Sequence, residues 1–276
     1  MATISAADVA KLRKSTGAGM MNCKKALQEA DGDFEKAVGI IRKKGQAVAS
    51  KRADRDAGEG VVLAKTTEDG KYGAMIVLNC ETDFVAKNDD FVKFAFNILD
   101  KALETKPDSL DSLKDTPIDG VSIGEMVVEQ IGIIGEKIDL SFFDSLATDF
   151  VQPYIHPGNK LATLVGFNKA GLDARFYKDV AMQVAAMNPL AVDKEDVSEK
   201  VIQQELEIGM EQARREGKPE ELLERIAQGK LGKFFKENTL MNQDFVKDNK
   251  MTIRQYLQSA DKDLKIIGFK RVNLNN

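Results

Sequence analysis

The sequence predicts an α+β protein in which an N-terminal three-helix bundle precedes a core of two related α+β units. Three observations carry this prediction. Apolar residues recur at helical spacing in three short segments before residue 45, and apolar runs typical of strands first occur beyond residue 60. A similar order of strand, loop and helix recurs after residue 154, which indicates an internal repeat whose second copy carries a long helical hairpin.

We expect four parts along the chain of 276 residues. They are a basic three-helix head with its linker at 1–55, a first α+β core unit at 56–145, a second α+β core unit at 146–196 and 237–276, and a helical hairpin insertion at 197–236. The hairpin is expected to project from the core, and a hairpin that lies flat on the core is the alternative.

Capping and turn residues define the three helices expected in the head. Ser5 and Asp8 form a capping-box pattern before the first helix, which a Gly-Ala-Gly stretch ends. Asn22 is expected to cap the second helix and Asp33 the third. Gly45 is expected to end the third helix, because glycine readily adopts the conformation that follows a helix, and the polar residues after it are predicted to form a linker.

A change from helical periodicity to runs typical of strands predicts the two core units. The first unit is expected to contain strands at 61–66 and 72–79 joined by a tight turn, a loop at 80–90, helices at 91–102 and 123–130, and a strand at 137–143. The second unit is expected to contain a turn-rich lead-in at 154–158, a strand at 161–167, a helix at 177–187 and a closing strand at 264–274. Two helical stripes around Pro219 predict the hairpin.

Charge is distributed unevenly along the chain, whose formal net charge is −4. Residues 1–55 hold 12 Lys and Arg against 6 Asp and Glu, a net charge of +6, so the remainder carries −10. A basic head on an acidic body favours an acidic protein surface or a nucleic acid as the partner of the head.

Several classes of site are not expected. The two cysteines, Cys23 and Cys80, have no neighbouring ligand at metal spacing, and His156 is the single histidine, so neither a metal site nor a histidine-based triad is predicted. The chain lacks a GxxxxGK[ST] loop, so we expect no direct nucleotide binding and no cofactor. Without an apolar run of membrane-spanning length or a signal pattern, the protein is expected to be cytoplasmic and without a membrane partner.

Two segments go beyond generic patterning: Thr-Gly-Ala-Gly-Met-Met-Asn-Cys-Lys-Lys-Ala-Leu at 16–27 and Asn-Cys-Glu-Thr-Asp-Phe-Val-Ala-Lys-Asn at 79–88. Together they resemble the elongation factor Ts family, and the resemblance spans nearly the whole chain. It implies a non-enzymatic guanine-nucleotide exchange factor of translation. Such a factor binds the GDP-bound GTPase, elongation factor Tu, and promotes release of GDP so that GTP can bind.

The second segment has two interpretations from its residues alone. Phe84 could be tucked under the loop with Thr82 or Asp83 capping a short turn, or it could be an exposed aromatic wedge, since loops often carry binding residues. The family resemblance favours the wedge. It implies that Thr82, Asp83, Phe84 and Val85 intrude near the magnesium site of the GTPase and help to dislodge the ion.

The first segment also has a structural and a functional interpretation. A helix start would place at least one of Met20 and Met21 in the core of the head, while the resemblance implies that Arg13, Met20, Met21 and Lys24 contact the nucleotide-binding domain of the GTPase. By the same resemblance, His156 contacts another domain of that partner. Family members commonly carry a further tail beyond the last strand, so the contact made by that tail is expected to be reduced here.

Two rival functions remain from the sequence. The basic head could bind RNA, in which case the chain is an RNA-binding or adaptor module, but Phe34 is the one aromatic residue of the head and belongs to an apolar stripe. The abundant carboxylates could instead serve an enzyme, although no pair stands out. Nucleic acid and enzymatic chemistry are therefore not expected.

Overall fold

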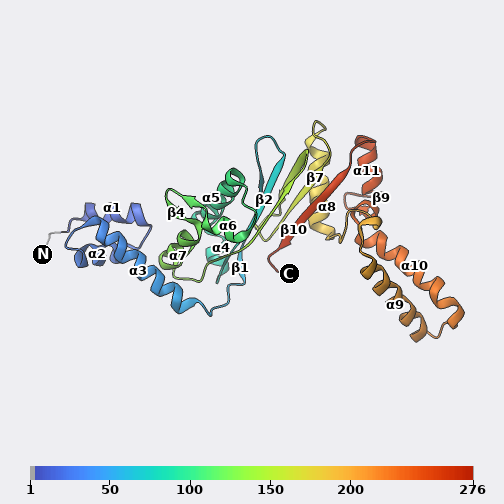
Figure 1. Cartoon of the computed structure of the whole chain (residues 1–276), viewed down its shortest axis with the longest axis horizontal. Helices are drawn as coiled ribbons and strands as arrows, with labels where there is room; N and C mark the ends of the chain where they lie inside the picture. The colour runs from blue at the N-terminus through green and yellow to red at the C-terminus, as the bar shows by residue number, and fades with distance from the viewer. Residues whose placement is uncertain (1–3, 276) are drawn as a thin grey trace.

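The computed structural model describes residues 4–275, and its parts follow one another along the long axis of the molecule (Figure 1). A helical head lies at one end, two sheets with their covering helices lie in the middle, and a helical hairpin projects at the other end. The predicted α+β class with its N-terminal helical bundle is confirmed. The domain boundaries given above stay predictions.

The head contains three helices, α1 (Ala6–Thr16), α2 (Met20–Glu29) and α3 (Phe34–Arg52). The capping box of Ser5 and Asp8 is formed, and the Asp33 side chain accepts from the backbone N–H of Lys36. The prediction that Asn22 caps α2 was wrong. The chain is extended at Gly19, two residues after Gly17, the left-handed C-cap of α1, so the second helix already begins at Met20.

The prediction that Gly45 ends the third helix was also wrong, because α3 continues to Arg52. Gly45 is buried where α3 crosses α7 (Ile123–Ile134), and its partner there is Gly132. A Cβ atom added to Gly132 would lie 2.4 Å from the Cα atom of Gly45, so the two helix backbones can approach this closely only if position 132 is glycine, whereas a Cβ atom added to Gly45 would be 3.6 Å from the Cα atom of Gly132, an ordinary contact. Gly45 therefore lies at a helix–helix contact, and residues 46–52 of the expected linker belong to α3.

The first sheet has the antiparallel order β1-β2-β5. Its strands are β1 (Glu59–Thr66), β2 (Tyr72–Cys80) and β5 (Asp139–Ala147). Between β2 and β5 the chain forms α4 (Asp83–Ala86), α5 (Asp89–Thr105), α6 (Leu110–Asp115), β3 (Pro117–Ile118), β4 (Val121–Ser122) and α7. Phe91 and Ile98 of α5 and Ile123 of α7 pack on one face of this sheet, against alternate residues of its strands.

The second sheet repeats this topology in the order β10-β7-β6. Its elements are β6 (Phe150–Ile155), β7 (Leu161–Phe167), α8 (Ala174–Met187), β8 (Asp244–Phe245), β9 (Asp248–Thr252), α11 (Ile253–Ala260) and β10 (Ile266–Asn273). In both units a strand hairpin is followed by a long helix, a small two-stranded hairpin, a helix that begins with a capping box, and the third strand. This common order confirms two related units.

The expected turn-rich lead-in at 154–158 was partly wrong, because β6 continues to Ile155. Pro153 lies within β6 opposite Leu164 of β7. Proline is tolerated there because β6 is at the edge of its sheet and does not need the missing backbone N–H for a second neighbour. The small strands β8 and β9 and the helix α11 were not predicted from the sequence.

The two sheets pack face to face. Val62 and Met75 of the first sheet meet Val151, Ala162 and Leu164 of the second in one buried cluster. Because strand side chains alternate between faces, each sheet buries one face against the other sheet and the opposite face against its own helices. The core therefore consists of four layers, in which the two sheets lie in the middle and the helices of each unit cover the outer face of its own sheet.

The hairpin consists of α9 (Glu199–Arg215) and α10 (Glu220–Asn238), and it extends away from the sheets rather than lying on them (Figure 1). Gly209 of α9 faces Ala227 of α10, with only 3.1 Å between a Cβ atom added to Gly209 and the Cα atom of Ala227. At the base of the hairpin, the carboxylate of Asp193, which follows α8, accepts a hydrogen bond from the side-chain amide of Asn242 and forms an ion pair with Arg254 of α11. Within residues 4–275, no helix combines the length and apolar character needed to cross a bilayer.

Candidate interaction site around the α4 turn

The segment that follows β2 forms a single helical turn, α4, and Thr82 is its N-cap. The hydroxyl of Thr82 accepts the backbone N–H of Val85 at 3.4 Å. Asn88 then caps α5 by accepting the backbone N–H groups of the first turn, so the chain is capped on both sides of α4. Val85 is half-buried against the first core and Ala86 is buried, which fixes the inner side of the turn.

Phe84 points outward from this turn, and 82% of its surface is exposed. The interpretation of Phe84 as a side chain tucked under the loop was therefore wrong, because the core beneath is already filled by its neighbours Val85 and Ala86. The turn presents an aromatic ring to solvent while its backbone is held by caps. An exposed aromatic residue on a held turn is a suitable anchor for a partner protein.

Asp83 lies beside Phe84 and is paired within the same turn. The Lys87 ammonium is 2.6 Å from the Asp83 carboxylate, and this hydrogen bond lowers the pKa of Asp83, with a smaller contribution from the charge of Lys160. Asp83 is therefore ionised at neutral pH, and Lys87 already compensates much of its charge.

A network of carboxylates and backbone donors holds the chain in front of α4. Glu81 accepts the backbone N–H of Lys137 at 2.6 Å and pairs with Arg52 at the end of α3 at 2.7 Å. Glu136 accepts from both the backbone N–H and the hydroxyl of Thr82. Sequence analysis missed Glu81, Arg52, Glu136 and Lys137, because the contacts join segments 29 to 84 residues apart and no local pattern connects them.

His156 is exposed in the turn between β6 and β7, where its Nδ1 atom lies 3.0 Å from the hydroxyl of Tyr154. The same turn is fastened to the first sheet, since Lys160 pairs with Glu59 at 2.8 Å and the backbone N–H of Val62 donates to Asn159. Lys160 also lies close enough to Asp83 to affect its pKa. The structure thus brings the turn that carries His156 next to the first unit on the side of α4.

The four head residues lie apart from α4. Arg13, Lys24 and both methionines are exposed, with Met20 48% and Met21 64% accessible. The expectation that at least one methionine packs in the core of the head was wrong, because Cys23, Ala26 and Leu27 occupy that face of α2. α1 and α2 form the outer end of the molecule (Figure 1), so the head residues and α4 form two separate surfaces.

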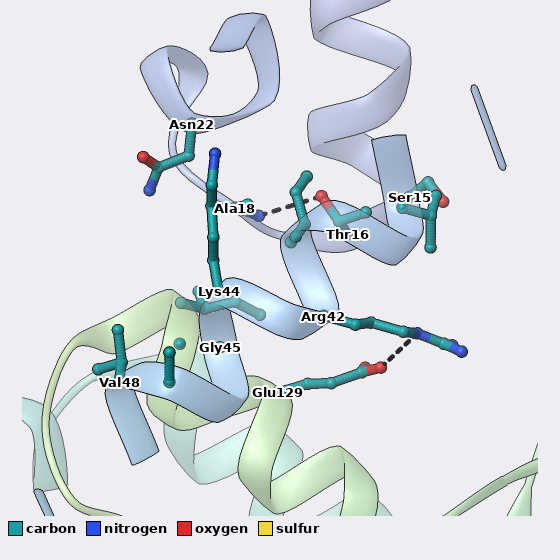
Figure 2. A pocket seen from close by; sticks show the side chains of 14 residues that line it. Ser15, Thr16, Ala18, Asn22, Arg42, Lys44, Gly45, Val48 and Glu129 are labelled. Carbon is teal, nitrogen blue, oxygen red and sulfur yellow. Dashed lines mark hydrogen bonds and ion pairs between the residues drawn. The ribbon is translucent and has the colours of Figure 1, made fainter. Parts of the chain in front are cut away.

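A cavity of about 440 Å³ separates the loop between α1 and α2 from the crossing of α3 and α7. Figure 2 shows Arg42 of α3 paired with Glu129 of α7 at its edge, at 2.8 Å. Thr16 and Asn22 line the side formed by the head. This cavity was not predicted from the sequence.

The described residues contain no group of three or more His, Cys, Asp or Glu side chains that could hold a metal ion. Cys23 and Cys80 are both free and buried. Burial raises the pKa of Cys80 to about 12, so this thiol stays protonated and unreactive at neutral pH.

Comparison with known proteins gives one consistent result. The family model described as "Elongation factor TS" matches residues 81–276. Elongation factor Ts of Amoebophilus asiaticus is 54% identical over 271 residues, which cover 98% of each chain. The proteins of the same name from Porphyromonas gingivalis and Christiangramia forsetii are 52% and 50% identical, over 97% and 99% of this chain and 97% and 100% of their own lengths.

Proposed function

This chain belongs to the elongation factor Ts family, and we propose on that basis that it binds a GTPase of the elongation factor Tu type and promotes loss of its GDP during translation. GTP then binds the emptied site. Exchange of a bound nucleotide makes and breaks no covalent bond, so the proposed role is that of a binding protein rather than an enzyme. The nucleotide contacts belong to the GTPase, and this chain needs none of its own.

The finer proposal is that the α4 turn disturbs the Mg²⁺ and phosphate site of the GTPase. The exposed ring of Phe84 on a capped turn is the observation that supports it. An exchange factor must bind the nucleotide-free GTPase more tightly than the nucleotide-bound form. Linkage then requires that bound GDP lower the affinity of the GTPase for the factor by the same ratio as the factor lowers its affinity for GDP. A ring inserted near the metal site acts in this way, because it competes with the arrangement that holds Mg²⁺. Asp83 lies beside the ring, with its carboxylate paired to Lys87.

Two further surfaces are proposed to supply affinity. The head presents Met20 and Met21 between Arg13 and Lys24, a combination of adaptable apolar and basic side chains that suits an acidic protein surface. The exposed His156 turn is proposed to contact another domain of the same GTPase. These surfaces hold the partner while α4 acts at the nucleotide site.

RNA binding by the head is not favoured. The one aromatic ring of the head, Phe34, is half-buried against the core of the head, and the Lys11 ammonium lies 5.0 Å from its centroid. A base therefore has no free ring on which to stack. No carboxylate pair in the described residues suggests an enzymatic site either.

The proposal is tested by Phe84→Ala. At saturating factor, stimulated release of a fluorescent GDP from the GTPase should slow by roughly tenfold or more, while affinity for the nucleotide-free GTPase changes less. The free variant should keep its urea midpoint, since truncation of a buried Phe would cost about 3–5 kcal/mol but this ring is exposed.

The matched control is Ile267→Ala, another exposed apolar side chain, on β10 of the second unit. Its release kinetics should equal those of the unmodified protein. A Phe84→Ala variant that loses stability and releases GDP at the normal rate would show that Phe84 is structural and that α4 is not the exchange element.

A further inference from the structure

We propose that Glu136 is a positioning residue for nucleotide exchange, because its carboxylate holds the α4 turn in the orientation that presents Phe84. This inference rests on the proposed function of α4 and adds a residue to it. Glu136 lies 52 residues after Phe84 in the sequence and is only half-exposed, so it acts through the turn rather than as a contact surface.

The contact is bidentate and involves the residue that begins the turn. One oxygen of Glu136 accepts the hydroxyl of Thr82 at 2.7 Å, and the other accepts the backbone N–H of Thr82 at 3.0 Å. The same hydroxyl accepts the backbone N–H of Val85 and so caps α4. The backbone N–H and the hydroxyl of Thr82 therefore both donate to the carboxylate of Glu136, and hydrogen bonds to a carboxylate are stronger than those between neutral groups.

The position of Glu136 is itself fixed from several sides. Gly135 ends α7 in the left-handed conformation, with φ of 80° and its N–H bonded to Ile131. The next residue, Lys137, uses its backbone N–H to hold Glu81 and its ammonium to bind the carbonyl oxygens of Ala53 and Arg55, each at 2.8 Å. The segment 135–137 thus joins the end of α3, the end of α7 and the chain that enters α4.

The four-residue length of α4 makes this support necessary. One helical turn is not stable by itself in water, because nucleation fixes several residues for a single hydrogen bond. Without Glu136, the backbone and hydroxyl of Thr82 lose their acceptor, and Phe84 samples other orientations. The fraction of molecules with a competent turn falls, and the release rate at saturation falls with it. Docking through the head and the His156 turn does not depend on this contact.

The experiment measures release of a fluorescent GDP by stopped flow at saturating full-length factor, for Glu136→Ala and Glu136→Gln. The alanine variant should release roughly tenfold more slowly, as expected if about one molecule in ten keeps the competent turn. Glutamine keeps one acceptor oxygen and should lie between alanine and the unmodified protein. Affinity for the nucleotide-free GTPase should change by less than about threefold.

A double variant separates positioning from general destabilisation. If Glu136 acts through Phe84, the pair Glu136→Ala with Phe84→Ala should release GDP no more slowly than Phe84→Ala alone. Glu125→Ala is the matched control, because this carboxylate also accepts a backbone N–H, that of Ser122, but at the opposite end of α7. Glu125→Ala should leave GDP release unchanged, and its urea midpoint should shift by a small amount similar to the shift in Glu136→Ala.

The outcomes distinguish this inference from the proposal on which it rests. If Phe84→Ala slows release but Glu136→Ala does not, or if the two effects are additive, the positioning role is wrong and the role of α4 stands. If Phe84→Ala leaves release unchanged, the role of α4 is wrong and the inference falls with it. Should Glu136→Ala fail to fold, Glu136→Gln gives the same test.

Discussion

Single side chains at the junction of three segments decide how the candidate site is presented. Glu81 is the central one, since it accepts the backbone N–H of Lys137 and pairs with the guanidinium of Arg52. The residue that follows it, Thr82, is the N-cap of α4. The N–H of Lys137 together with Arg52 and Arg55 holds the pKa of Glu81 below its ordinary value of 4.5. Its charge therefore contributes to stability, and the contribution depends on pH.

The expected result is a pH-dependent difference between the unmodified protein and Glu81→Gln. A carboxyl whose pKa is lower in the folded state stabilises the fold at pH above its unfolded value, and this stabilisation is lost as pH falls through the folded pKa. The two urea midpoints should therefore differ most at neutral pH and converge below pH 4.5.

Glu68→Gln, an exposed carboxyl in the turn between β1 and β2, is the control and should show a much smaller difference at neutral pH. A difference between Glu81→Gln and the unmodified protein that stays constant from neutral to acid pH would contradict the assignment.

At the scale of elements, the crossing of α3 and α7 attaches the head to the core. Gly45 and Gly132 allow the closest approach, and Val48 and Ala49 in the last turns of α3 pack against the first core. The crossing holds the end of α3 where Arg52 can reach Glu81, so it also supports the chain that enters α4.

The crossing is tested by Gly132→Ala. The new methyl group would lie 2.4 Å from the Cα atom of Gly45, so the two backbones must separate, and overpacking of this kind costs about 1–3 kcal/mol. Gly39→Ala is the matched control, because Gly39 lies inside α3 with no atom within 4 Å of an added Cβ and should gain about 1 kcal/mol from helix propensity. Urea melts of both variants measure the difference, and equal midpoints would exclude the close contact.

The same elements show what could be predicted from the sequence and what could not. Capping by Ser5 and Asp33, and the apolar runs that form β1, β2 and β7, are local signals that needed only neighbouring residues. Gly45 failed as a helix end because its partner, Gly132, lies far along the chain. The exposure of Phe84 followed from the family resemblance rather than from periodicity.

The support of the α4 turn could not be predicted for a physical reason. Thr82 carries an obvious capping signal, but the acceptor that holds it, Glu136, comes 54 residues later and follows a helix end like any other. Contacts of this range are set by the folded arrangement of the sheet and its helices. Prediction from one sequence therefore gave the residues of the turn but not their anchors.

At the scale of the whole molecule, the hairpin of α9 and α10 is a separate projection. Its buried residues, Gly209, Ala213, Leu223, Ala227 and Leu231, are those of the two helices facing each other. Within the part of the chain that the structure describes, hydrogen bonds and ion pairs join the hairpin to the second unit at its last turn, through the carbonyls of Glu237 and Asn238 and through Lys236, which pairs with Asp244.

Replacing residues 200–234 with a short flexible linker should therefore leave the core cooperatively folded. Closing such a surface loop costs little entropy, so the midpoint of a thermal melt followed by circular dichroism should move by less than about 5 °C. Phe245→Ala, which empties a buried position of the second unit, should lower the midpoint more. Loss of the folded baseline in the shortened protein would show that the hairpin is part of the core.

The position of β10 in the second sheet has a consequence for synthesis of the protein. Its residues pair with β7, about a hundred residues earlier in the chain, and Ile266 completes the core beneath α8. The first sheet, by contrast, is complete once β5 has been made. On the ribosome, the first unit can fold while the chain is still growing, whereas β7 keeps one edge open until β10, about a hundred residues later, has been translated.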